Sequence, residues 1–199
     1  MVRGQIVTSC NSSFLSCEKD LQEIIEKLFV FSGPYSEKLK RLLVINNENC
    51  LDENITEYSK AMKEYSVKRL KQETYIKFNP KIKFPEHEDI KSYLIFGFDN
   101  FVPNATNPQF RDNIVTIDIM CHTDCWDLGD YKIRPLVIAG YIDGILNNSR
   151  LTGIGKFEFL GCSELILSEN LAGYTLMYKA IHGSDDKIPS KEEAIDNAW

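Results

Sequence analysis

The spacing of apolar residues changes partway along the chain, and this change is the strongest constraint on the fold. From about Thr74 to His182, apolar residues mostly alternate with polar ones, as in a strand with one buried face. Before that region they recur every three or four positions, as on an amphipathic helix, at Leu21, Ile24, Ile25 and Leu28. A helical region and a sheet-forming region therefore share 199 residues, which is enough for one domain with a full core.

Residues 1–72 are expected to form an N-terminal helical region. Its first helix begins with Ser16 as a side-chain cap and ends at Ser32–Pro34. A short helix or strand follows through LKRLLVI, and a second long helix spans Ile55–Gln72, with Tyr58, Met62 and Tyr65 along one face. The other faces of that helix are basic and carry Lys60, Lys63, Lys68, Arg69 and Lys71. This basic cluster either contacts DNA or an acidic partner, or is a solvated helix face.

Residues 73–183 are expected to form strands, one helix and further strands. TYIKF, KIKF and SYLIFGF are strand candidates, and NIVTIDIMCH places Val115, Ile117, Ile119 and Cys121 on one face. A helix follows with Pro135 in its first turn and an apolar stripe at Ile138, Tyr141, Ile142, Ile145 and Leu146. KFEFLGC and LAGYTLMYKAIH are the closing strands. This order predicts an α+β fold, in which one main helix packs on a largely antiparallel β-sheet. Residues 184–199 are expected to be an extended arm.

Composition and charge exclude several classes of protein. A hydrophobic share of 43% and a charged share of 26% match globular proteins and argue against wholesale disorder. The net charge of -6 argues against a dedicated nucleic-acid binder. The sequence has neither an 18-residue apolar run for a membrane span nor the apolar stretch of a signal peptide, so we expect the protein to stay where it is made.

The segment NNSRLTGIGKFEFLGC, residues 147–162, has the glycines and lysine of a phosphate-binding loop. A Walker loop fails because Arg150 stands where its first glycine belongs and Phe157 where its hydroxyl residue belongs. A dinucleotide fingerprint needs a strand before the glycines and a helix after them, and here the predicted order is reversed. We interpret Gly153 and Gly155 as a helix exit and a tight entry into the next strand.

The six cysteines and three histidines raise the question of a metal site. Cys121, His122, Asp124 and Cys125 form one cluster, whereas a structural zinc usually takes its four ligands from two. Strand alternation also puts Cys121 and His122 on opposite faces. No cysteine pair has C-x-x-C spacing, so we interpret the cysteines as small buried hydrophobic residues.

Two enzyme classes stay open as alternatives. A cysteine-dependent hydrolase would pair Cys162 with His122 or His182. A metal nuclease would use Asp118 and Glu158, but KFEFLG has no lysine two residues after the acid. We expect no enzyme activity, and no catalytic, cofactor or metal-binding residue.

The elements between about Asn113 and His182 form a distinctive series. A strand ending in a cysteine–histidine step, IVTIDIMCH, leads through a polar turn to the Arg-Pro helix IRPLVIAGYIDGIL. NNSRLTGIGKFEFLG and the strand LAGYTLMYKAIHG follow. This series resembles the head-to-tail connector and tail-terminator proteins of tailed bacteriophages, over a little more than a third of the chain.

The resemblance implies a structural virion protein that forms a ring, of about six or twelve copies, in the neck between portal and tail. Its partners would be further copies of itself, portal or adaptor proteins, tail or tail-tube proteins, and genomic DNA that passes without sequence-specific binding. No cofactor and no membrane are implied. It would be found in the virion and, during assembly, in the host cytoplasm.

The exact position in the particle stays open, because the first 70 or so residues add helices to the compact family pattern. A terminator, an adaptor that contacts the portal and another collar ring are all compatible. The alternative is a different tail component, such as a baseplate or sheath-end protein.

A ring of identical subunits joins unlike surfaces, so we expect contacts at the glycine turn, the basic helix and the arm. The candidate interface residues are Arg150, Gly153, Gly155, Lys156, Lys68, Arg69 and Trp199. Trp199 would act as an aromatic anchor, with a frayed terminus as the alternative.

Overall fold

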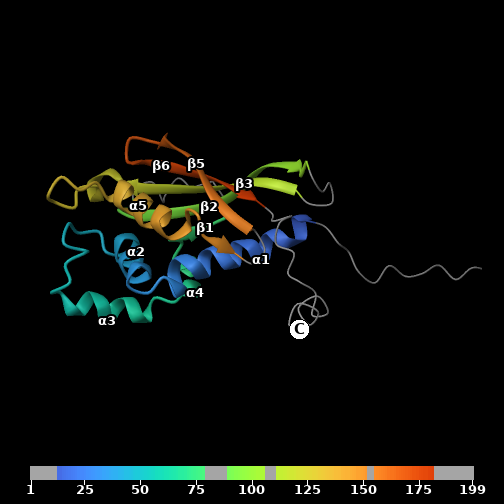
Figure 1. The fold of residues 1–199 in the computed structure, drawn as a ribbon. Helices are drawn as coiled ribbons and strands as arrows, with labels where there is room; N and C mark the ends of the chain where they lie inside the picture. Colours follow the sequence, from blue (N-terminus) through green and yellow to red (C-terminus); the bar gives the residue numbers. More distant parts are fainter. Residues whose placement is uncertain (1–12, 79–88, 106–110, 152–154, 182–199) are drawn as a thin grey trace, which may run out of the picture.

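The computed structural model describes residues 13–78, 89–105, 111–151 and 155–181 (Figure 1). The described helices are α1 (Ser13–Glu26), its continuation as the π-helix η1 (Lys27–Phe31), α2 (Pro34–Val44), α3 (Thr56–Glu64), α4 (Val67–Gln72), the 3₁₀ turn η3 (Thr123–Cys125) and α5 (Arg134–Leu146). The described strands are β1 (Ile76–Lys77), β2 (Ser92–Pro103), β3 (Arg111–His122), β4 (Arg150–Leu151), β5 (Gly155–Ile166) and β6 (Leu171–Ile181). The predicted α+β class is confirmed. Within these residues, no helix is long and apolar enough to cross a bilayer.

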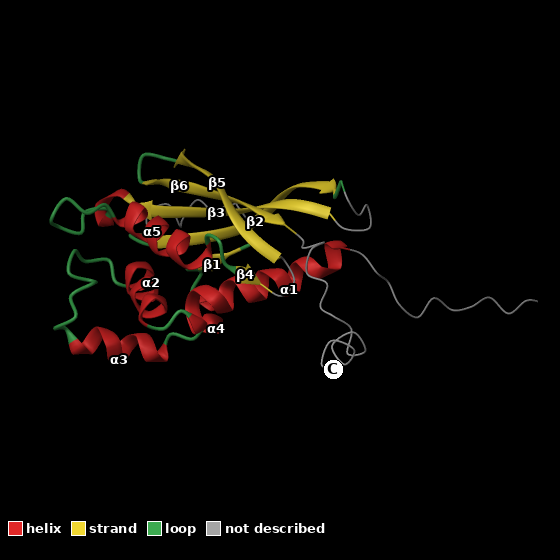
Figure 2. Ribbon diagram, in the orientation of Figure 1, coloured by secondary structure: helices red, strands yellow, loops and turns green. Residues whose placement is uncertain are grey.

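The strands form one sheet in the order β1-β2-β3-β6-β5-β4. Every pairing is antiparallel except that of the two-residue strand β1 with β2. In the central strand β3, Ile117 lies opposite Phe96 of β2 and Leu176 of β6. The predicted face of Val115, Ile117, Ile119 and Cys121 is fully buried, because the helices cover this side of the sheet (Figure 2).

Helix α5 packs across β3 and β6, as the sequence predicts. Its residues Ile138, Ile142 and Leu146 are completely buried, and Pro135 lies in its first turn. The carboxylate of Asp143 accepts a hydrogen bond of 3.0 Å from the hydroxyl of Tyr178 on β6. Burial raises the pKa of that hydroxyl, so it stays a donor that ties the helix to the sheet.

The N-terminal helices share one continuous core with the sheet. Ile24 of α1, Leu28 of η1 and Leu39 of α2 are completely buried, in the same cluster as Ile117 and Ile142. The helical spacing found in the sequence therefore marks the side of α1 that packs on the rest of the molecule. Figure 1 shows α1 and α2 on the same side of the sheet as α5.

The start and end of the first helices differ in part from the prediction. Helix α1 begins at Ser13, so Ser16 lies inside the helix and does not cap it. Its π-helical continuation ends where expected, before Ser32 and Gly33. Gly33 has a φ of 56°, which lets the chain turn sharply into α2. The segment LKRLLVI, for which helix and strand were both open, lies in helix α2 except for its last residue, the C-cap Ile45.

The predicted helix from Ile55 to Gln72 is wrong as one element, because the chain forms two helices there. Between α3 and α4, Ser66 adopts an extended conformation, and its hydroxyl accepts a hydrogen bond from the backbone N–H of Arg69 at 3.2 Å. This serine therefore caps a new helix. The break turns α4 away from the axis of α3 and brings it to the side of α1 (Figure 1).

The connection after α5 also differs from the prediction. The helix ends at Leu146 with Asn147 as its C-cap, and Asn148 follows with a φ of 59°, so the exit precedes Gly153, which lies outside the described residues. Strand β4 follows and pairs Arg150 with Lys156 and Leu151 with Gly155, so this segment contains a strand pairing. Of the early strand candidates, TYIKF contributes only β1, while KIKF and the arm at residues 184–199 lie outside the described residues.

A buried arginine joins α5 to the end of α2. The guanidinium of Arg134 is completely buried and donates four hydrogen bonds of 2.5 to 2.8 Å to backbone carbonyls. Three acceptors, Leu42, Ile45 and Asn47, lie at or just after the C-terminus of α2, where carbonyls lack partners within the helix. The fourth is Cys125, in the turn before α5.

Candidate functional site

The candidate interface residues fall on two surfaces that lie on either flank of α1 and η1. Arg150, Gly155 and Lys156 belong to the β4–β5 pairing, and Lys68 and Arg69 belong to α4. The structure does not bring the two sets together. Gly153 and Trp199 lie outside the described residues.

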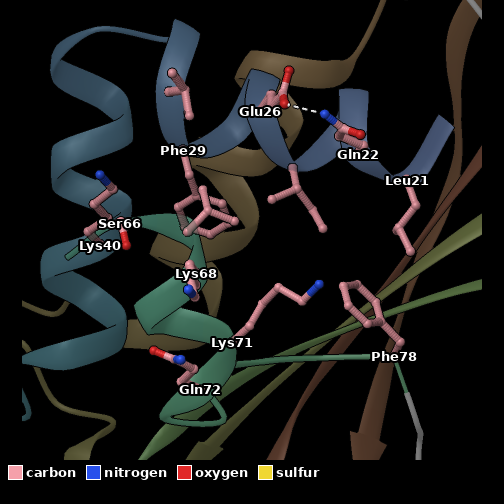
Figure 3. Close-up of a pocket in the computed structure, with 13 residues that line it drawn as sticks. Leu21, Gln22, Glu26, Phe29, Lys40, Ser66, Lys68, Lys71, Gln72 and Phe78 are labelled. Atoms are coloured by element: carbon pink, nitrogen blue, oxygen red, sulfur yellow. Dashed lines mark hydrogen bonds between the residues drawn. The ribbon is translucent and has the colours of Figure 1, made fainter. Parts of the chain in front are cut away.

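A groove of about 1050 Å³ lies between α1, η1 and α4 (Figure 3). We call it the basic groove. Its apolar residues are Leu21, Ile25, Phe29, Val30, Val67 and Phe78, and its polar residues are Gln22, Glu26, Lys40, Ser66, Lys68, Lys71 and Gln72. Sequence reasoning named Lys68 and Lys71 from this set, as part of the basic cluster, but not the groove, because the groove exists only once α1 and α4 lie side by side.

Three lysines make the groove positively charged. Within the part of the chain that the structure describes, Lys40, Lys68 and Lys71 form no salt bridge. The ammonium of Lys71 lies 4.7 Å from the ring centre of Phe78 (Figure 3). Burial lowers the pKa of Lys40, against an opposing effect of Glu37. A positive rim around apolar side chains suits a ligand that is both apolar and acidic.

Arg69 makes different contacts from its neighbour Lys68, which lines the basic groove. Its Nε donates to the carboxylate of Glu73 at 2.7 Å, and its Nη1 lies 3.8 Å from Glu64. Its guanidinium also stacks 4.1 Å from the ring centre of Tyr65. This hydrogen bond from Arg69 lowers the pKa of Glu73. Arg69 therefore holds the α3–α4 corner together, while Lys68 faces the groove.

Arg150 lines a second, smaller hollow of about 320 Å³ on the other flank of α1. Glu23, Glu26, Lys27, Phe31 and Leu151 complete its walls. Lys156 lies opposite both Arg150 and Ile181 in the sheet. The β4–β5 pairing thus packs towards α1, and its role in subunit contacts stays a prediction.

The outer edge of β5 is a surface that the sequence analysis missed. Strand β4 pairs only with Gly155 and Lys156, so among the described residues β5 has no strand beside residues 160–166. We call this segment the β5 edge. Apolar side chains at and beside it are exposed: Phe159 by 43%, Leu160 by 51%, Ile166 by 69% and Leu167 by 44%. The apolar run Leu165–Leu167, which places apolar side chains on both faces, is the sequence signal for such a surface.

The opposite end of the sheet has a second long edge. Strand β1 pairs with β2 only at Leu94 and Ile95, which leaves the outer side of β2 from Phe96 to Pro103 without a neighbouring strand among the described residues. Val102 on this edge is 42% exposed. The two edges belong to different strands and have different sequences, so they are unlike surfaces.

The cysteine–histidine cluster is part of the packing. Cys121 is completely buried, and burial raises the pKa of its thiol to about 12. The thiol of Cys125 donates to the carbonyl of His122 at 3.1 Å, and His122 accepts from the backbone N–H of Asp124 at 3.2 Å. Among the described residues, no three His, Cys, Asp or Glu side chains are grouped to hold a metal ion.

The residues of the two enzyme alternatives are not assembled into a site in the described part. Asp118 accepts a hydrogen bond of 2.7 Å from the hydroxyl of Thr175, whereas Glu158 lies opposite Lys179 in the register. These two positions on β6 are about 13 Å apart along the strand. Cys162 is exposed, partial burial raises its pKa, and His182 lies outside the described residues.

Comparison with known proteins identifies a family for this chain. The model of the YomW family, a phage-derived family, matches residues 36–180, which run from α2 to the end of β6. No curated protein and no solved structure matches the chain. The family match covers more than half of the sequence and includes the sheet, α3, α4, α5 and nearly all of α2, whereas α1 and η1 precede it. The chain therefore belongs to the YomW family of phage-derived proteins.

Proposed function

We propose that this protein is a structural component of the phage particle that assembles into a ring in the neck, between the portal and the tail. It terminates or joins the tail there and lines the passage of the DNA. Membership of a phage-derived family and the α+β architecture support this proposal. The β5 edge is the observation that carries it.

The β5 edge has the properties of a docking strand. Unpaired edge strands are a liability that monomeric proteins usually cover with charge, a bulge or another element. The register of β5 does shift between Phe159 and Gly161, as at a bulge, but Leu160 and Ile166 stay more than half exposed beside the edge. A strand from another chain would complete the backbone hydrogen bonds of β5 and would cover these side chains.

The second edge, on β2, supplies an unlike surface for a head-to-tail contact. If β5 of one copy pairs with β2 of the next, every copy uses both edges once. Such heterologous contacts close into a ring when the rotation per subunit divides a full turn. Ring formation therefore gives a use to both ends of the sheet.

The charge of the protein fits a passage for DNA. The net charge of -6 means that a ring of many copies is strongly acidic. An acidic bore repels the phosphate backbone, so the genome passes without being held. We propose no catalytic role and no cofactor for this protein.

Charged substitutions at the β5 edge test the proposal. We expect Leu160→Lys and Ile166→Lys to convert assembled protein into monomers, because a buried unpaired lysine opposes strand docking. Tyr131→Lys is the matched control, since this side chain is fully exposed on a turn away from the edge. Particle mass is measured by light scattering and folding by circular dichroism. Full assembly of both edge variants would rule out this interface.

A further inference from the structure

The basic groove has the form of a binding site for an acidic amphipathic segment. Phe29 lies in its apolar floor, and Val30 and Phe78 remain 53% and 41% exposed at its mouth. Lys40, Lys68 and Lys71 stand around these side chains without a salt bridge among the described residues. An apolar helix face with acids beside it would satisfy both features in a single contact.

The C-terminal segment of this chain has the complementary pattern. Residues 185–199, DDKIPSKEEAIDNAW, contain five acidic residues and two lysines. The segment as a whole has no apolar period, but its last ten residues have one. On a helix, the apolar residues Ala194, Ile195, Ala198 and Trp199 share one side, and the acids Glu192, Glu193 and Asp196 share the other.

The start of this short helix is also marked in the sequence. Ser190 follows Pro189, and Glu193 stands three residues after Ser190, which is the spacing of a capping box. A helix of about ten residues is marginal in water by itself, so it needs a surface to pack on. The basic groove offers that surface, and its lysines lie where they can pair with the acidic side of the helix.

We propose that the basic groove binds residues 190–199 of a neighbouring copy, with Trp199 and Ile195 on its apolar floor and the acids towards its lysines. The inference rests on the proposed ring, in which residues 190–199 of each copy would connect it to the adjacent subunit. We call this connecting segment the strap. The tether is the eight residues 182–189 between Ile181 and this helix, which span about 28 Å when extended and so reach the groove of an adjacent, touching copy. Each copy then gives one segment and accepts one, as in a head-to-tail assembly.

A photocross-link in the full chain tests this contact. Trp199 is replaced by the photoreactive residue p-benzoylphenylalanine, and chains labelled with ¹⁴N and ¹⁵N are mixed, irradiated, digested and analysed by mass spectrometry. We expect position 199 to cross-link to residues 21–30 or 66–72, with the two linked peptides carrying different nitrogen isotopes.

Charge reversal identifies the role of the lysines. Lys68→Glu with Lys71→Glu is expected to lower the cross-link yield about tenfold, and Glu192→Lys with Glu193→Lys to restore it in that background. Lys60→Glu with Lys63→Glu is the matched control, because these lysines lie on α3 outside the groove. The control is expected to leave the yield unchanged.

The outcomes separate this inference from the ring itself. Cross-links outside the groove, or only between peptides of the same isotope, would overturn the strap even if rings are present. Groove cross-links of mixed isotope in a protein that forms only open chains or dimers would support the strap and contradict the ring.

Discussion

Arg134 shows how much one residue contributes to joining the two parts of this protein. In the sequence it only marks the start of an Arg-Pro helix. In the structure its guanidinium reaches the carbonyls of Leu42, Ile45 and Asn47 at the end of α2. The sequence could not predict this, because the acceptors are backbone atoms about ninety residues away and leave no pattern in the side chains.

Arg134→Met is therefore expected to lower the free energy of unfolding by about 3 kcal/mol, because it leaves buried carbonyls without donors. Lys132→Met, at an exposed position just before α5, is the control and should change stability by less than about 0.5 kcal/mol. Urea denaturation of both variants measures the difference. Equal midpoints for the two variants would show that Arg134 is not a structural link.

Gly173 is a second residue whose importance depends on the fold. A Cβ at this position would lie 1.8 Å from the carbonyl oxygen of Ile119 on β3, whereas a Cβ at Gly140 on α5 would meet nothing within 4 Å. We expect Gly173→Ala to destabilise the protein by about 3 kcal/mol and Gly140→Ala to stabilise it by about 1 kcal/mol. Thermal denaturation distinguishes the two. A stable Gly173→Ala variant would mean that β3 and β6 are further apart than described.

At the scale of the elements, the predictable parts are those with a local period. The α5 stripe and the alternation in β3 each identify a buried face from residues close together in sequence, and both are confirmed. The division at Ser66 was missed, because a single capping serine outweighs the apolar spacing of residues 55–72. The basic groove was missed for another reason: its walls come from α1 and α4, and periodicity does not tell which elements meet.

Helices α2 and α3 are joined by a polar cluster that makes stability depend on pH. The carboxylate of Glu37 accepts hydrogen bonds from Ser59 at 2.7 Å and from Arg41 at 2.8 and 3.0 Å. The hydrogen bond from Ser59, with further effects of Arg41, lowers the pKa of Glu37 below its ordinary value of 4.5. A lowered pKa means that this contribution to stability is complete above pH 4.5 and is lost as the pH falls through the folded-state pKa.

We therefore expect Glu37→Gln to reduce the loss of stability on acidification. The free energy of unfolding is compared between pH 7 and pH 3.5 for the wild type and the variant. The variant should be less stable at pH 7 and should lose less on going to pH 3.5. Glu57→Gln, at an exposed position on α3, is the control and should follow the wild type. Parallel pH curves for wild type and Glu37→Gln would contradict the assigned role.

At the scale of the whole molecule, helices cover one face of the sheet, and within the described residues both long edge strands lack a neighbouring strand over much of their length. Strand order depends on contacts between residues that are far apart in the sequence. The sequence could therefore predict the strands β5 and β6, but not that β5 lies near an edge of the sheet. The series of elements that resembles phage neck proteins, residues 113–182, lies almost entirely within residues 36–180, which the YomW family match covers. The β5 edge, the β2 edge and the basic groove all follow from the arrangement of elements around that region.

The most direct test of the proposed function is the particle mass of the purified full chain, measured across protein concentrations and combined with electron microscopy of the particles. The proposed function predicts a discrete closed ring with a central hole, of about six or twelve copies. A protein that remains a monomer at every concentration, alone and mixed with isolated phage tails, would contradict it.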